Sequence, residues 1–200
     1  MSIFNIPLKI LRYVKKTKFI KDFKKCARSS GFGDAGNGRD CIIVGKENMS
    51  IGENCSFGPG CELYAYNSHF EQKLNSQLIV GNNVRVTARC RITCAGSIEL
   101  GNDVLIAPDV FITDHNHGTY PGLSGGYSRQ PLVVRNVSIE EGVWIGQSAC
   151  ILPGVKIGKY SIVGANSVVT HDIPSYSMAV GAPAKVIKHW NEEKEKWEKV

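Results

Sequence analysis

The sequence predicts an all-β fold, in which short parallel strands wind into a coil of six-residue repeats, a parallel β-helix. From Ile139 to Pro174 the chain reads as six consecutive hexamers, and each of them opens with Ile or Val. A period of six fits neither an α-helix nor a simple strand, and it is typical of solenoids in which each hexamer supplies a strand and a corner. Half of the second and fifth hexamer positions hold small residues, which suit a corner with little room: Gly146, Gly158, Gly164, Ala149, Ser161 and Ser167.

The same period continues upstream in shorter blocks that two interruptions separate. The apolar residues that open these hexamers are Ile51, Phe57, Leu63, Val80, Val86, Ile92, Ile98, Leu100, Ile106 and Ile112. The first interruption, Tyr64 to Gln77, predicts a small excursion. The second, residues 115–135, is rich in Gly, Pro and Tyr and predicts a loop that projects from the coil. Because the surface of a solenoid is regular, we expect function at such an insertion.

Two terminal segments differ from the repeats. Residues 1–30 contain nine Lys or Arg and one Asp, a net charge of +8, whereas the whole chain carries +6, so residues 31–200 carry −2. This first segment predicts a basic amphipathic helix. Residues 31–200 predict a single β-helix domain. A short charged helix is expected over residues 189–200, with Trp190 and Trp197 on one face.

The distribution of charge bears on partners and location. Because residues 31–200 are not basic, we expect no nucleic acid partner. A basic amphipathic helix can lie on an anionic bilayer, so residues 1–30 are expected either to contact the inner membrane peripherally or to cap the open end of the first coil. No apolar run approaches the ~20 residues of a membrane span, and Ile3 to Val14 lacks the features of a signal peptide. These observations favour a cytoplasmic protein.

The seven cysteines predict packing rather than disulfide bonds. Cys55, Cys61 and Cys90 occupy the small fifth position of a hexamer, where a thiol is a compact apolar filler. Reduced thiols agree with the expected cytoplasmic location.

Two motifs carry a resemblance to a known family. The hexamers are followed by Val-Gly-Ala-Pro-Ala-Lys-Val-Ile-Lys over residues 180–188, and Phe-Ile-Thr-Asp-His-Asn-His-Gly occupies residues 111–118. From about residue 40 to 200 the chain resembles the left-handed β-helix acyltransferases with hexapeptide repeats, in particular the O-antigen and lipopolysaccharide O-acetyltransferases. The resemblance implies the left hand of the coil, acetyl-CoA as acetyl donor, and a homotrimer in which the histidine loop of one chain faces the coenzyme tail of its neighbour.

The expected chemistry requires a base but no nucleophilic side chain, because a sugar hydroxyl can attack the thioester directly. Thr113-Asp-His115 resembles the Thr-x-His that carries the catalytic histidine in the galactoside and maltose branch of the family. Imidazole can accept a proton near neutral pH, so His115 is the predicted base and His117 the alternative. Asp109 or Asp114 would orient the working imidazole.

The resemblance also implies coenzyme-binding positions. Trp144 would lie beside the acyl chain, and Gly146 would bring a backbone N–H to the thioester. The positions that match the pantetheine arm and the adenosine end are Ala165, Thr170, Pro183, Lys185 and Lys188. Polar and aromatic residues that could contact the acceptor sugar are Thr87, Arg89, Tyr120, Tyr127, Arg129 and Arg135.

Together these features predict an acetyl-CoA-dependent O-acetyltransferase that modifies a cell-surface polysaccharide, such as O-antigen, lipopolysaccharide or capsule, or its precursor. One alternative is an N-acetyltransferase for a nucleotide-linked amino sugar, or for a small molecule. Others are a γ-type carbonic anhydrase with zinc on three histidines, and a non-catalytic scaffold. The Gly-x-Pro-Ala-Lys tail favours a coenzyme over a metal.

Overall fold

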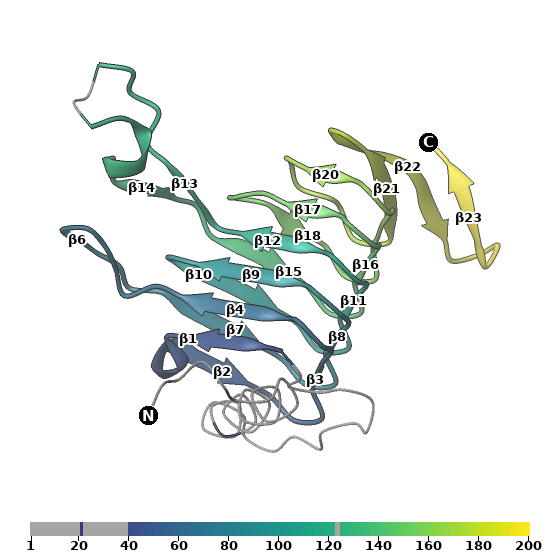
Figure 1. Cartoon of the computed structure of the whole chain (residues 1–200). Coiled ribbons are helices and arrows are strands. Elements are labelled where there is room, and N and C mark those ends of the chain that lie inside the picture. Colours follow the sequence, from purple (N-terminus) through teal and green to yellow (C-terminus); the bar gives the residue numbers. More distant parts are fainter. Residues whose placement is uncertain (1–20, 22–39, 123–124) are drawn as a thin grey trace.

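The chain forms a three-sided coil of short parallel strands (Figure 1). The computed structural model describes residue 21, residues 40–122 and residues 125–200. Apart from Lys21, the expected helix of residues 1–30 therefore lies outside the described residues. The arrangement of stacked parallel sheets is the one expected of a left-handed parallel β-helix. No helix in the described part is long and apolar enough to cross a membrane.

Three sheets form the sides of the coil. The first sheet contains β1 (Ile42–Val44), β4 (Glu62–Ala65), β9 (Arg91–Cys94), β12 (Phe111–Thr113), β17 (Cys150–Ile151) and β20 (Val168–Val169). The second contains β2 (Met49–Ile51), β7 (Gln77–Val80), β10 (Ser97–Leu100), β15 (Val137–Ile139) and β18 (Lys156–Ile157). The third contains β3 (Ser56–Phe57), β8 (Arg85–Val86), β11 (Leu105–Ile106), β16 (Trp144–Ile145), β19 (Ile162–Val163), β21 (Ser177–Gly181), β22 (Ala184–Asn191) and β23 (Lys196–Lys199).

The apolar residues that open the hexamers fill the interior. Val86, Ile106 and Ile145 pair in register on successive coils, and each is at most 2% exposed. Every inward side chain therefore packs on its equivalents above and below, which removes apolar surface from water along the whole coil. The predicted frame is confirmed, because all the hexamer-opening residues named above are buried. Cys55, Cys61 and Cys90 are buried beside them, and the six described cysteines are free thiols.

The corners use residues that tolerate a left-handed backbone. Asn54, Asn83 and Asp103 stand at equivalent corners of three coils with φ of 55°, 58° and 58°. Asn and Asp adopt this conformation more readily than other residues that carry a Cβ. Their side chains also form a ladder, in which Asn54 Nδ2 donates to Asn83 Oδ1 (2.9 Å) and Asn83 Nδ2 donates to Asp103 Oδ1 (3.0 Å). The ladder fixes the stacking of this edge.

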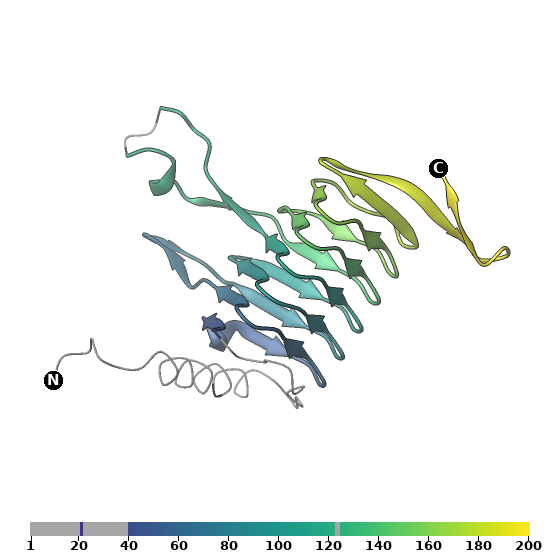
Figure 2. The same ribbon diagram turned by 45° about the vertical axis from the view of Figure 1, so that its right-hand side comes forward.

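Both sequence interruptions leave the coil at the corner between the first and second sheets (Figure 2). Within Tyr64 to Gln77 lies a hairpin of β5 (Ser68–His69) and β6 (Gln72–Lys73). Residues 115–135 hold a second hairpin of β13 (His115–His117) and β14 (Leu132–Val134), with a 3-10 turn η3 (Tyr127–Arg129) between its strands. A further 3-10 turn, η2 (Lys46–Asn48), precedes β2.

The predicted helix over residues 189–200 is wrong. This part of the chain lies in β22 and β23, which extend the third sheet as an antiparallel hairpin, and residues 40–122 and 125–200 contain no α-helix. A spacing of seven residues also suits a hairpin, because Trp190 and Trp197 pair directly across its strands with ring centroids 5.6 Å apart. β22 pairs along the edge of β21, and β23 pairs in turn with β22, so the strand edge at the end of the coil determines the local structure.

Candidate active site

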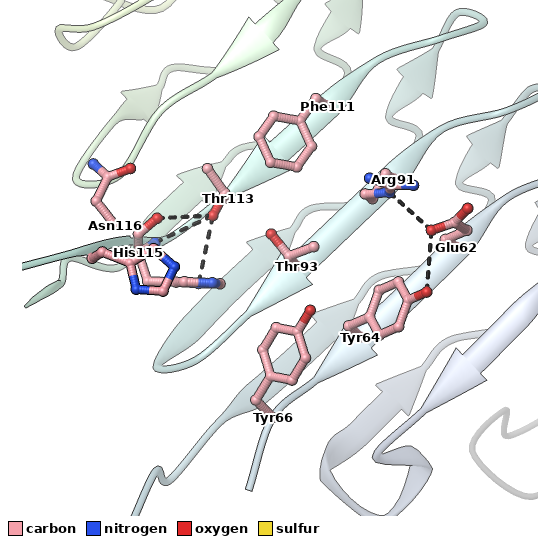
Figure 3. A pocket seen from close by; sticks show the side chains of 10 residues that line it. Glu62, Tyr64, Tyr66, Arg91, Thr93, Phe111, Thr113, His115 and Asn116 are labelled. Atoms are coloured by element: carbon pink, nitrogen blue, oxygen red, sulfur yellow. Dashed lines mark hydrogen bonds and ion pairs between the residues drawn. The ribbon is translucent and has the colours of Figure 1, made fainter. Parts of the chain in front are cut away.

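A pocket of about 470 Å³ lies on the outer face of the first sheet, where the β13–β14 hairpin leaves the coil (Figure 3). Its floor consists of outward side chains from three adjacent strands. Tyr64, Thr93 and Thr113 stand in register across β4, β9 and β12. The lining residues are Glu62, Tyr64, Tyr66, Arg91, Thr93, Phe111, Thr113, His115, Asn116 and His117.

His115 occupies the end of this floor, directly after β12. Its side chain is 14% exposed, and its ring meets the edge of the Tyr66 ring at a centroid distance of 5.7 Å. Nδ1 lies 2.8 Å from Oδ1 of Asp114. An ionised carboxylate can only accept hydrogen bonds, so Nδ1 carries the proton and Nε2 is the lone-pair nitrogen of the neutral ring. This tautomer suits a general base that acts through Nε2.

Asp114 is fully buried, and its carboxylate is held from several sides. Oδ1 also accepts the Ala95 N–H (2.8 Å), and Oδ2 accepts the Gly96 N–H (2.7 Å). Burial alone raises the pKa of a carboxyl group, but the hydrogen bonds from His115 and from these two amides outweigh it, and the pKa of Asp114 lies below its usual range. The site therefore contains a buried, ionised carboxylate at neutral pH.

The carboxylate of Asp114 also contacts a thiol. Cys94 Sγ lies 3.4 Å from Oδ2 of Asp114. Burial, with the charge of Asp114 as a second cause, raises the pKa of Cys94 to about 12. The thiol therefore stays protonated and acts as a weak donor to the carboxylate, rather than as a nucleophile.

The alternative base and the alternative orienting carboxylate have different surroundings. His117 is exposed, and its ring lies 5.2 Å from the ring of His69. Within the described chain no carboxylate forms an ion pair with His117. Asp109 pairs with Arg89, with Nε–Oδ1 at 2.6 Å, and neither residue lines the histidine pocket. The geometry therefore favours His115 with Asp114.

A polar network that the sequence did not reveal forms the opposite wall. Arg91 Nε lies 2.8 Å from Oε2 of Glu62, and the Tyr64 hydroxyl donates to the same oxygen at 3.1 Å. The hexamer frame contained a signal for these residues, since it aligns Leu63, Ile92 and Ile112 as inward equivalents. The residues on either side of those three point outward and form the floor of the pocket.

The positions expected to bind coenzyme lie mainly on the third sheet. Trp144 is 48% exposed and stands in an outward row between Leu105 and Ile162. Gly146 follows at the next corner, where an added Cβ would lie 2.6 Å from the Ala165 nitrogen, so the glycine permits close packing of successive coils. Its N–H donates to the Val163 carbonyl at 2.8 Å. This N–H therefore already has a hydrogen-bond partner in the next coil.

The other coenzyme positions lie near the C-terminal end of the coil. Lys185 and Lys188 belong to β22, and Pro183 lies in the turn before it. Thr170 follows β20 and bonds His171 through Oγ1 and Nδ1 at 2.8 Å. None of the expected coenzyme positions lines the histidine pocket. A single chain thus places them apart from His115, mainly on another side of the coil.

The expected acceptor residues are dispersed, and none of the six lines the histidine pocket. Arg89 lines an adjoining hollow of about 410 Å³, which shares Glu62, Arg91 and Phe111 with that pocket. The Thr87 hydroxyl donates to the Ile106 carbonyl at 3.0 Å. The remaining four lie on the long loop or at its end: Tyr120 and Tyr127 are exposed, Arg129 lines a pocket between the two hairpins, and Arg135 packs beside Gly154.

The described residues contain no group of three or more His, Cys, Asp or Glu that could hold a metal ion. The carbonic anhydrase alternative requires three histidines at one site. The closest imidazole contact is the pair His69 and His117. The described residues therefore bring no three histidines together as zinc ligands.

Stacked six-residue coils, with an imidazole–carboxylate pair at an insertion, place the chain in the class of parallel β-helix proteins with hexapeptide repeats. The family model described as bacterial transferase hexapeptide (six repeats) matches residues 136–171. The chain is similar to the protein named "Putative lipopolysaccharide biosynthesis O-acetyl transferase WbbJ" of Escherichia coli. The two are 36% identical over 165 residues, and the alignment covers 80% of this chain and 81% of that protein. The chain therefore belongs to the hexapeptide-repeat acetyltransferase family, and it is an acetyltransferase.

Two further comparisons extend this result. The galactoside O-acetyltransferase of Lactococcus lactis is 35% identical over 154 residues, which span 75% of this chain and 67% of that protein. Among solved structures, AntD, an N-acyltransferase from Bacillus cereus in complex with dTDP-4-amino-4,6-dideoxyglucose and coenzyme A, aligns with a TM-score of 0.64. The alignment covers 94% of this chain and 92% of AntD at 19% identity, so it shows the shared fold alone.

Proposed function

We propose that this protein is an acetyl-CoA-dependent O-acetyltransferase that modifies a hydroxyl group of a cell-surface glycan or its precursor. The observation that carries the proposal is the His115–Asp114 pair, which opens onto a polar pocket on the sheet face. The two relatives named above, whose names specify O-acetyl transfer in lipopolysaccharide biosynthesis and to galactosides, support the choice of a sugar hydroxyl.

The proposed mechanism is direct transfer. Nε2 of His115 takes the proton of the acceptor hydroxyl as that oxygen attacks the thioester carbonyl carbon. The buried Asp114 carboxylate stabilises the resulting imidazolium through its hydrogen bond to Nδ1. When the tetrahedral intermediate collapses, the C–S bond breaks and the leaving thiolate takes the proton back from Nε2. The products are an acetyl ester and coenzyme A, and His115 returns to its neutral form.

The acceptor class can be tested by a screen with acetyl-CoA and detection of released thiol. We expect release with free glycans or lipid-linked oligosaccharides, and slower release with nucleotide-linked amino sugars. Coenzyme A alone should raise the melting temperature, because a ligand that binds only the folded state stabilises it. Activity confined to amino sugars would contradict O-acetylation, and a melting temperature that coenzyme A leaves unchanged would contradict the coenzyme assignment.

We further propose that the active site is completed by a neighbouring copy in a homotrimer. The support is the separation of the coenzyme positions, mainly on the third sheet, from the histidine pocket on the first sheet. In a cyclic trimer the first sheet of one chain can face the third sheet of the next, and the heterologous contact closes on itself. Sedimentation should therefore show a trimer.

Mixed trimers test the shared site. We expect His115→Ala and the double variant Trp144→Ala/Lys185→Glu each to be nearly inactive alone. Co-expression of the two should restore about a quarter of the sites in randomly mixed trimers, because such a site joins an intact histidine from one chain to an intact coenzyme face from the next. An active monomer, or no recovery in purified mixed trimers, would contradict a site shared between chains.

We also propose that residues 1–30 recruit the enzyme to the cytoplasmic face of the inner membrane, where lipid-linked precursors are accessible. Each Lys or Arg near an anionic surface is worth about 1 kcal/mol, so engagement of half of the nine gives roughly 4 kcal/mol. At low salt the protein should co-sediment with vesicles that contain phosphatidylglycerol. Replacement of Lys15, Lys16, Lys24 and Lys25 by Glu should abolish this binding. Equal binding by the variant would leave the capping role for this segment.

A further inference from the structure

The two hairpins that leave the coil are joined to each other by one side chain. Gln72 of β6 accepts the Leu132 N–H through Oε1 at 2.6 Å and donates from Nε2 to the Leu132 carbonyl at 3.1 Å. Its amide thus pairs with β14 as a strand backbone would. Because Leu132 is opposite His117 in β13, this contact places the tip of the β5–β6 hairpin beside the histidine pocket.

A second pocket of about 300 Å³ lies between the hairpins. It is lined by His69, Phe70, Glu71, Gln72, Arg129 and Pro131. A series of ring contacts connects it with the histidine pocket. The rings of Phe70 and His69 meet edge to face at 4.8 Å, and those of His69 and His117 lie 5.2 Å apart. Since His117 also lines the histidine pocket, the two pockets are neighbours.

Phe70 combines a left-handed backbone with high exposure at the edge of this pocket. It stands in the two-residue turn between β5 and β6 with φ of 49°, in the left-handed region that Gly or Asn would normally occupy. Its side chain is also 66% exposed. A bulky residue in this conformation costs on the order of 1 kcal/mol, and such strain is concentrated at functional sites. This exposed ring, beside a pocket, offers an apolar face to a ligand.

A polar atom at the same place also lacks a partner. Nε2 of His69 is the one buried side-chain nitrogen or oxygen in the described part of the chain without a hydrogen-bond partner. Buried polar groups in folded proteins almost always have such partners. The atom belongs to the ring that lies between Phe70 and His117, so the unmet hydrogen bond is located between the two pockets.

We propose that the pocket between the hairpins is a second sugar subsite, which binds the unit next to the one that is acetylated at His115. The face of the Phe70 ring suits the C–H face of a pyranose, and Arg129 and Glu71 offer charged groups to its hydroxyls. The inference rests on the proposed O-acetyltransferase function and narrows its acceptor to an oligosaccharide. Binding energy from the second sugar would raise kcat/KM for longer acceptors.

The test compares two acceptors with the full chain. These are the O-antigen or capsule repeat unit released from the host strain, and a methyl glycoside of the single sugar that is acetylated. We expect the wild type to prefer the repeat unit. In Phe70→Ala the KM for the repeat unit should rise by about 5- to 10-fold, while turnover of the methyl glycoside stays unchanged. Phe70→Tyr should retain the preference.

Two glycine variants separate binding from folding. Phe70→Gly removes the ring but suits the positive φ, so it should melt at or above the wild-type temperature and still lose the preference for the repeat unit. Tyr176→Gly is the matched control, because Tyr176 is also an exposed aromatic residue at positive φ, on a corner of the coil. It should keep the preference.

Two results would overturn the second subsite. One is a wild type that acetylates the repeat unit and the methyl glycoside with equal kcat/KM, and the other is a Phe70→Ala variant that loses the same factor in kcat/KM on both acceptors. Failure to acetylate either glycan is a different result. It would refute the proposed function, and the subsite would fall with it.

Discussion

Replacement of His115 by alanine is expected to lower kcat by about 10² to 10⁴, the usual contribution of general acid–base catalysis. The reason is that Nε2 of this ring is the lone-pair nitrogen, fixed by the hydrogen bond of Nδ1 to a buried carboxylate. Binding of acetyl-CoA should remain nearly intact, because the expected coenzyme positions lie outside this pocket. Steady-state kinetics and coenzyme binding by calorimetry measure the two effects separately.

The matched control is His117→Ala, two residues further along the same strand. We expect a smaller loss of kcat, because that imidazole has no carboxylate partner among the described residues. If His117→Ala abolished turnover while His115→Ala retained most of it, the base would be His117. The direct-attack mechanism would then stand with a different residue.

Asp114→Asn is expected to lower kcat by a similar factor, about 10² to 10⁴, because an amide no longer holds the His115 ring in the required tautomer. The change also disturbs the fold locally. The carboxylate accepts hydrogen bonds from His115, Ala95 and Gly96, whereas asparagine has a single acceptor oxygen and leaves a buried donor unmatched. We expect a loss of about 1 to 3 kcal/mol in the free energy of unfolding, measured by urea titration.

The pH dependence of that loss follows from the lowered pKa of Asp114. The folded-state pKa lies below the value of about 3.9 expected for an unfolded Asp. Its stabilising contribution is therefore present in full above about pH 4, and it is lost as the pH falls through the folded-state pKa. The stability difference between wild type and Asp114→Asn should therefore shrink as the pH falls below about 4. A difference that kept its full size far below that pH would contradict a buried, ionised carboxylate.

Asp109→Asn serves as the matched carboxylate control. Asp109 pairs with Arg89 outside the histidine pocket, so its replacement should leave kcat within a few-fold of wild type. A loss as large as that of Asp114→Asn would show that the orienting carboxylate was assigned wrongly.

The repeats made most of the fold predictable, because a six-residue period fixes which side chains point inward. Ile51, Ile106 and Ile145 are buried as that period requires. The same rule does not apply beyond the last coil, where a seven-residue spacing of tryptophans suits a helix and a hairpin equally. The edge of β21 at the end of the coil pairs with β22 and so determines the hairpin. Such a sheet edge is visible only in three dimensions.

The candidate site was predictable where its residues are contiguous in sequence. Asp114 and His115 adjoin each other at the end of a hexamer, so their motif could be read directly. Glu62 and Arg91 are separated by a full coil and an excursion, and their contact requires the register of the sheet. Sequence also left Asp109 as an alternative to Asp114, since both are near His115 along the chain. Only Asp114 contacts the His115 ring.

We propose above that the enzyme forms an acetyl ester on a sugar oxygen with His115 as the base, and this reaction leaves a distinctive product. It is tested most directly by two-dimensional NMR of the glycan product made from labelled acetyl-CoA by wild type and by His115→Ala. We expect a labelled acetyl group on one sugar oxygen, which mild alkali removes, and almost no product with the variant. An alkali-stable acetyl group on nitrogen, or undiminished product from the variant, would contradict it.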